Sequence, residues 1–87
     1  MASKITVLPS ISVSATWQRL TSSSMNTSGQ TVFINCSGGV YFNTTNADAG
    51  RTYLSTGNYD FSGADPATLW FQQVSAGPAV GGYVITE

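Results

Sequence analysis

Apolar and hydroxyl-bearing residues alternate along the first part of the chain. Hydroxyls fall mostly on even positions, and the odd positions carry Ile5, Val7, Ile11, Val13, Ala15 and Trp17. A period of two predicts extended backbone with one buried face. Pro9 cannot donate a hydrogen bond to a neighbouring strand, so it either divides the run or marks a free sheet edge. Residues 1–16 are therefore predicted to form an edge strand or an extended arm that lies along a neighbouring subunit.

Short strand-like stretches, separated by turn residues, recur through the rest of the chain. The strongest is Thr31–Cys36, in which every even-numbered residue is apolar. Gly38 and Gly39 follow it and predict a tight turn, which would make a hairpin with residues 40–42. Further strands are expected at 51–54, 59–61, 69–74 and 82–86. No stretch has the apolar spacing of an amphipathic helix.

Together these patterns predict an all-β fold: a single small antiparallel β-sandwich or jelly-roll-like barrel of about seven to eight short strands. Residues 17–87 are assigned to this sandwich domain, because no internal boundary interrupts them. At 87 residues the chain is below the usual size of one domain, and such a small core is only marginally stable alone. With no disulfide possible and with little protection at the strand edges, the domain is expected to self-associate.

The composition favours a structural role. Charged residues make up 8% of the chain, whereas a free-standing domain usually covers its surface with roughly 25–35% Lys, Arg, Glu and Asp. Twelve Ser and eleven Thr take their place. A surface of hydroxyls and amides is easily covered by another protein, so the composition predicts a part of an assembly.

The chain is poorly equipped for catalysis. It contains no His, so the single cysteine, Cys36, has no imidazole base to activate it and is expected to be a buried structural thiol. Asp48, Asp60 and Asp65 are the carboxylates that could act as a hydrolytic pair or bind Ca²⁺, and they are interpreted instead as turn-forming residues. We therefore expect no catalytic residue, no metal site and no cofactor, and a protein that is not an enzyme.

The charge balance also narrows the partners. A net charge of -1 with three basic residues offers no patch to neutralise phosphates, so neither nucleic acid nor an anionic membrane surface is an expected partner. No apolar run is long enough to span a membrane. The N-terminal residues lack the pattern of a signal peptide, which predicts synthesis in a cytoplasm without such a leader.

Adjacent aromatic residues must point to opposite faces of a strand. One member of each pair, such as Tyr41 in 41–42 and Trp70 in 70–71, is therefore expected to face away from the core. Exposed Trp and Tyr side chains are typical of protein interfaces, and they can also stack on sugars. The predicted partner-binding residues combine these aromatics with the N-terminal alternation: Ile5, Val7, Ile11, Val13, Trp17, Tyr41 and Trp70.

Six short motifs occur in a characteristic order. They are Trp-x-x-Leu at 17–20, Val-x-Ile-Asn at 32–35, a glycine pair leading into an aromatic strand at 38–42, Leu-x-x-Gly at 54–57, Leu-Trp-Phe at 69–71 and Val-Ile-Thr-Glu at 84–87. In this order of features the chain resembles small β-structured virion proteins of tailed bacteriophages.

The resemblance implies a non-enzymatic structural virion protein, made in the host cytoplasm. Its expected role is that of a capsid decoration or cement subunit, which docks on the capsid lattice and stabilises it. The partner would be the major capsid protein or another virion protein, and a homotrimer is the favoured oligomer. The alternative is a carbohydrate- or receptor-binding module of the tail, fibre or collar, with Trp17, Tyr41 or Trp70 as stacking surfaces.

Overall fold

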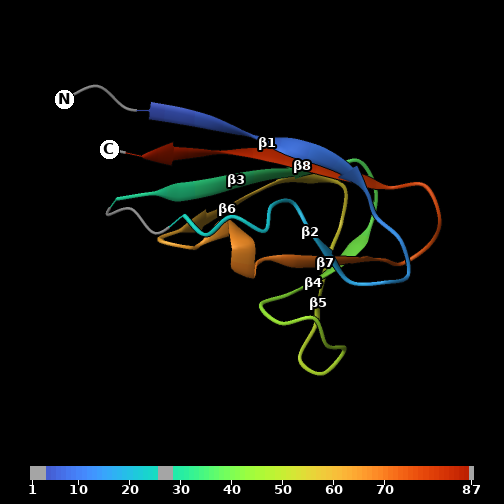
Figure 1. Ribbon diagram of the computed structural model, residues 1–87. Coiled ribbons are helices and arrows are strands. Elements are labelled where there is room, and N and C mark those ends of the chain that lie inside the picture. Colours follow the sequence, from blue (N-terminus) through green and yellow to red (C-terminus); the bar gives the residue numbers. More distant parts are fainter. Residues whose placement is uncertain (1–3, 26–28, 87) are drawn as a thin grey trace.

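The computed structural model describes residues 4–25 and 29–86, which form two four-stranded antiparallel sheets (Figure 1). The first sheet has the order β1 (Lys4–Ser12), β8 (Ala79–Thr86), β3 (Thr31–Cys36) and β6 (Gly57–Ser62). The second has the order β2 (Gln18–Arg19), β7 (Trp70–Gln73), β4 (Val40–Asn43) and β5 (Thr52–Leu54). A 3-10 turn, Pro66–Thr68, precedes β7. The predicted all-β fold of about eight strands is thus confirmed.

The strand pairing is that of one long hairpin rolled onto itself. β1 pairs with β8, β2 with β7, β3 with β6 and β4 with β5, all of them antiparallel. Two further pairings, β3 with β8 and β4 with β7, close this hairpin into the two sheets. Eight strands in two such sheets make a jelly roll. Lys4 and Thr86 are direct partners, so the two ends of the described chain lie side by side.

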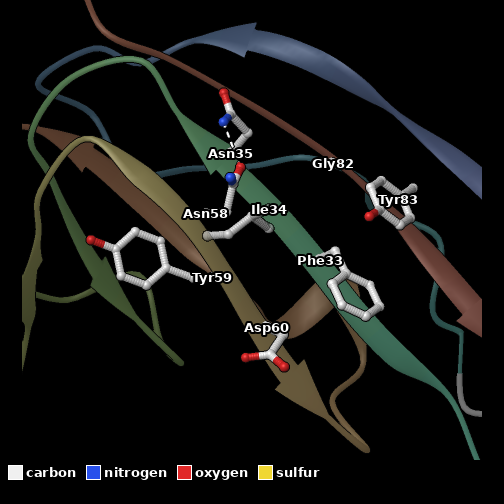
Figure 2. A pocket seen from close by; sticks show the side chains of 8 residues that line it. All are labelled: Phe33, Ile34, Asn35, Asn58, Tyr59, Asp60, Gly82 and Tyr83. Atoms are coloured by element: carbon white, nitrogen blue, oxygen red, sulfur yellow. Dashed lines mark hydrogen bonds between the residues drawn. The ribbon is translucent and has the colours of Figure 1, made fainter.

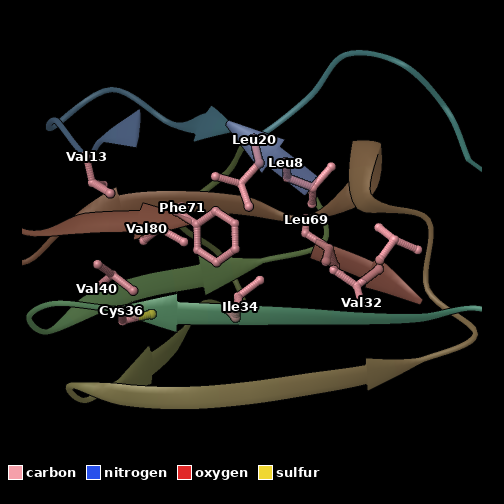
Figure 3. Packing of buried hydrophobic residues seen from close by; sticks show 11 residues of the cluster. Leu8, Val13, Leu20, Val32, Ile34, Cys36, Val40, Leu69, Phe71 and Val80 are labelled. Carbon is pink, nitrogen blue, oxygen red and sulfur yellow. The ribbon is translucent and has the colours of Figure 1, made fainter. Parts of the chain in front are cut away.

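The hydrophobic core lies between the two sheets (Figure 3). Every even-numbered residue of β3 is buried, which agrees with the alternation in its sequence. Phe71 of β7 is completely buried, and its ring centroid lies 5.7 Å from that of Phe42. The buried cluster comprises Leu8, Val13, Leu20, Val32, Ile34, Cys36, Val40, Leu69, Phe71, Val80 and Val84.

Residues 4–12 are an edge strand of the first sheet, with β8 as the single neighbour of β1. The pairing register shifts between Leu8 and Ile11: these residues oppose Gly82 and Val80, so β1 carries one extra residue there. Such a bulge is common on edge strands, and Pro9 lies within it, where its missing N–H costs no ladder hydrogen bond.

The bulge changes which side chains of β1 face the core. Leu8, at an even position, is buried, whereas Ile5 and Val7 are 63% and 79% exposed. Beyond the bulge the alternation is inverted, so Val13 is buried and Ile11 packs against the core. A shift of one residue moves a whole side-chain set to the opposite face. The expectation of one buried face for all the odd positions is therefore wrong for Ile5 and Val7, and also for Ala15, which is exposed.

The glycine pair after β3 does not make the expected hairpin. β3 and β4 belong to different sheets, so residues 37–39 cross from one sheet to the other. An added Cβ at Gly39 would lie only 2.6 Å from the hydroxyl oxygen of Tyr53. Gly39 lets the exposed ring of Tyr53 lie close to the backbone, and the glycine pair does not make a two-residue turn.

Candidate binding faces

The outer face of the second sheet pairs Arg19 with Trp70. The two residues are direct partners in β2 and β7, and the guanidinium carbon of Arg19 lies 4.7 Å from the centre of the Trp70 ring. Nη1 of Arg19 also donates a hydrogen bond of 3.1 Å to the carbonyl oxygen of Ala67. Because Phe71 points into the core, the adjacent Trp70 must point outward.

A second arginine covers a second aromatic ring on the same face. The guanidinium carbon of Arg51 lies 3.8 Å from the centre of the Tyr41 ring, and its Nη1 donates a 2.9 Å hydrogen bond to Oε1 of Gln72. The edge of the Tyr53 ring packs against Tyr41, with centroids 6.4 Å apart. Tyr41 and Gln72 are cross-strand partners, so their side chains lie on one face.

Asp48 connects Trp17 to this group. Nε1 of Trp17 donates a 2.9 Å hydrogen bond to Oδ1 of Asp48, and the same oxygen lies 3.7 Å from Nη1 of Arg51. The loop that carries Asp48 therefore joins residues far apart in the sequence. We call the resulting surface the Arg–aromatic face and define it by Trp17, Arg19, Tyr41, Arg51 and Trp70.

The predicted partner-binding residues are divided among three places. Trp17, Tyr41 and Trp70 meet on the Arg–aromatic face, Ile5 and Val7 lie on the outside of the first sheet, and Ile11 and Val13 turn toward the core. Sequence reasoning missed the two arginines. Two of the chain's three basic residues, Arg19 and Arg51, gather on one small face, and their guanidinium groups cover the rings that were expected to be open for stacking.

The outer face of the first sheet carries a row of four residues in register across all its strands: Val7, Tyr83, Phe33 and Asp60. The rings of Phe33 and Tyr83 stack with centroids 5.1 Å apart and planes at 15°. Phe33 shares its face of β3 with Thr31 and Asn35, and a large ring on an otherwise polar face is the signal that could have identified it. Tyr83 is 40% exposed, so the pair is accessible from solvent.

A concave site of about 280 Å³ opens beside these rings (Figure 2). Asn35 and Asn58 form its second side, and Nδ2 of Asn35 donates a 2.6 Å hydrogen bond to Oδ1 of Asn58. β8 has glycines at 81 and 82, so the sheet carries no β8 side chain next to Asn35. We call this site the Phe33–Tyr83 pocket; its lining is Phe33, Ile34, Asn35, Asn58, Tyr59, Asp60, Gly82 and Tyr83.

Asp60 lies within strand β6 and not in a turn, so its interpretation as a turn-forming residue is wrong. The other residues considered for chemistry have structural surroundings. Cys36 is buried in the core, and burial raises the pKa of its thiol. Hydrogen bonds from the Ser24 hydroxyl and from the backbone N–H groups of Met25 and Ala67 lower the pKa of Asp65, which caps the 3-10 turn. Within residues 4–25 and 29–86, no three His, Cys, Asp or Glu side chains gather as a metal site would require.

Comparison with protein-family models gives no match, and comparison with curated proteins gives none either. Among solved structures, the chain is similar to a de novo designed double-stranded β-helix, with 16% identity and a TM-score of 0.50. The match covers 99% of this chain and 97% of the designed one. At this identity the likeness concerns the fold alone. In the described part of the chain, no helix is sufficiently long and apolar to cross a membrane.

Proposed function

We propose that the protein is a non-enzymatic structural subunit that docks on a larger protein assembly through the Arg–aromatic face. The observation that carries the proposal is the make-up of this face, where Asp48 and Gln72 help to hold together side chains of three types: Trp, Tyr and Arg. These three residue types dominate the binding energy of protein interfaces. The face gathers both tryptophans of the chain and two of its three basic residues.

The side chains of this face are also held in place before a partner arrives. Arg51 is fixed by Tyr41, by Gln72 and by Asp48, while Arg19 is fixed by Trp70 and by the Ala67 carbonyl. Ordering a long side chain on binding costs about 0.5–1.5 kcal/mol, and side chains that are already ordered avoid this cost. The N–H groups of the two guanidiniums that remain open favour a partner surface with carboxylates or carbonyl oxygens.

The assembly we propose is the virion of a tailed bacteriophage, with the major capsid protein or another virion protein as the partner. The resemblance of the ordered motifs to small virion proteins supports this context, and the low charge content agrees with a surface that is covered in use. In this role the protein would decorate the capsid and stabilise its lattice.

Co-sedimentation of the purified protein with capsids that lack it tests the docking face. We expect the wild type to sediment with the capsids, and Arg51→Glu and Trp70→Ala to lose at least about tenfold in affinity, as truncation of interface hot spots does. Tyr83→Ala is the control, since Tyr83 is an exposed aromatic residue on the outer face of the first sheet. Equal binding by all four proteins would contradict docking through this face.

A further inference from the structure

The outer face of the first sheet, on the side opposite the Arg–aromatic face, has its own binding chemistry. We propose that the Phe33–Tyr83 pocket binds one pyranose ring of a neutral carbohydrate. The proposal concerns different residues from those of the docking face, so either can fail without the other. It rests on three features of the pocket, namely its aromatic surface, its paired amides and its single charge.

The aromatic surface is rigid and open. Phe33 and Tyr83 are direct cross-strand partners in β3 and β8, and their stacked rings fix each other. Among the described residues no cation covers either ring, in contrast to the rings of Tyr41 and Trp70. A pyranose has one face made of C–H groups, and this face packs on an aromatic ring as other apolar groups do.

The polar side of the pocket supplies matched donors and acceptors. The hydrogen bond between Asn35 and Asn58 orients both amides and leaves Oδ1 of Asn35 as an acceptor and Nδ2 of Asn58 as a donor. Adjacent sugar hydroxyls can donate to the first and accept from the second. The exposed carboxylate of Asp60, across the strand pair from Phe33, adds another acceptor for a hydroxyl.

The charge and the size of the pocket select the ligand. Asp60 is the sole charged side chain of the lining, while Arg19 and Arg51 are engaged on the other sheet. A sialylated or otherwise anionic sugar would therefore meet a like charge with no compensating cation. The volume of about 280 Å³ lies just below the range of roughly 300–1,000 Å³ typical of sites for drug-sized molecules, which suits one sugar ring.

Binding to glycopolymers tests the proposal with the intact chain. The probes are polyacrylamide carrying glucose, galactose, mannose or N-acetylglucosamine, and a sialyllactose polymer serves as the anionic comparison; binding is measured by surface plasmon resonance. We expect the wild type to bind at least one neutral polymer and not the sialylated one. Tyr83→Ala and Asn58→Ala should each weaken binding by about tenfold or more.

Tyr53→Ala is the matched control, because Tyr53 is an exposed tyrosine on the other sheet, and we expect it to bind the neutral polymer as the wild type does. Circular dichroism of each variant reports whether the fold is retained. The proposal is overturned if the wild type binds none of the neutral polymers or prefers the sialylated one. It is also overturned if folded Tyr83→Ala and Asn58→Ala both bind like the wild type.

Discussion

Two neighbouring aromatic residues of β7 are predicted to differ sharply in what they contribute to stability. Phe71 is completely buried between the sheets, and replacing it with Ala would leave a cavity at the centre of the core. Phe→Ala changes of this kind cost about 3–5 kcal/mol. Folded domains have total stabilities of about 5–15 kcal/mol, and small ones lie at the low end. We therefore expect Phe71→Ala to retain only about 0–2 kcal/mol of stability at room temperature.

Trp70→Ala should be much milder. Trp70 is half-buried on the outer face, and its specific contact is the stacked guanidinium of Arg19. A cation–π contact at an exposed site is worth about 0.5–1 kcal/mol, and the partial burial of the ring adds a similar amount. The expected cost is thus about 1–2 kcal/mol, which leaves the protein folded.

Urea unfolding followed by circular dichroism measures both changes. We expect the urea midpoint to shift slightly for Trp70→Ala and the transition to be lost or strongly weakened for Phe71→Ala. This result would agree with Trp70 pointing outward and Phe71 pointing into the core. If Trp70→Ala proved as destabilising as Phe71→Ala, the orientation of β7 would be wrong, and with it the Arg–aromatic face.

Three further predictions concern other parts of the fold. We expect the wild type to sediment as a trimer in analytical ultracentrifugation. Val7→Ser removes an exposed apolar side chain, so it should weaken the trimer while changing the free energy of unfolding by less than about 0.5 kcal/mol. A wild type that is monomeric at micromolar concentration would contradict self-association. Gly82→Ala should destabilise the fold by about 1–3 kcal/mol or more, because the added Cβ would lie 2.1 Å from the carbonyl oxygen of Phe33 in β3. At Gly81 the nearest atom to an added Cβ is 3.4 Å away, so Gly81→Ala should be the milder change when both are measured by urea unfolding. The pKa of Asp65 is lowered, so the hydrogen bonds of its carboxylate stabilise the fold at pH values above the ordinary pKa of 3.8, and this effect is lost as the pH falls below 3.8. The difference in the free energy of unfolding between wild type and Asp65→Asn should therefore shrink as the pH falls below 3.8. A difference that is independent of pH would contradict the capping role.

The sequence predicted the central strands well because their pattern depends on local geometry. Strand β3 lies between two neighbouring strands, and the second sheet covers its inner face. Alternate residues of β3 are therefore buried, as its sequence pattern indicates. The same rule failed for Ile5 and Val7, since the bulge at Pro9 inverts the alternation while the apolar residues remain on odd positions. The apolar Leu8 at an even position, directly before Pro9, was the local sign of this inversion in the sequence.

The binding faces could be predicted only in part. Tyr41 and Trp70 face outward as the adjacent aromatic pairs indicated, but the arginines that cover them come from elsewhere in the chain. The stacking of Phe33 on Tyr83 depends on the register between β3 and β8, which are separated in the sequence by residues 37–78. A single sequence does not show which residues of two distant strands are paired. The glycine pair at 38–39 was likewise ambiguous, because a glycine that permits a close approach and one that makes a turn look the same in sequence.

Mass spectrometry of purified particles tests most directly whether this chain is a structural component of a virion, as we propose. The particles would come from the infection in which the chain is made, separated from free protein by a density gradient. We predict that its peptides co-purify with the major capsid protein in a fixed proportion across the gradient. Abundance in the infected cell combined with absence from the purified particles would contradict the claim.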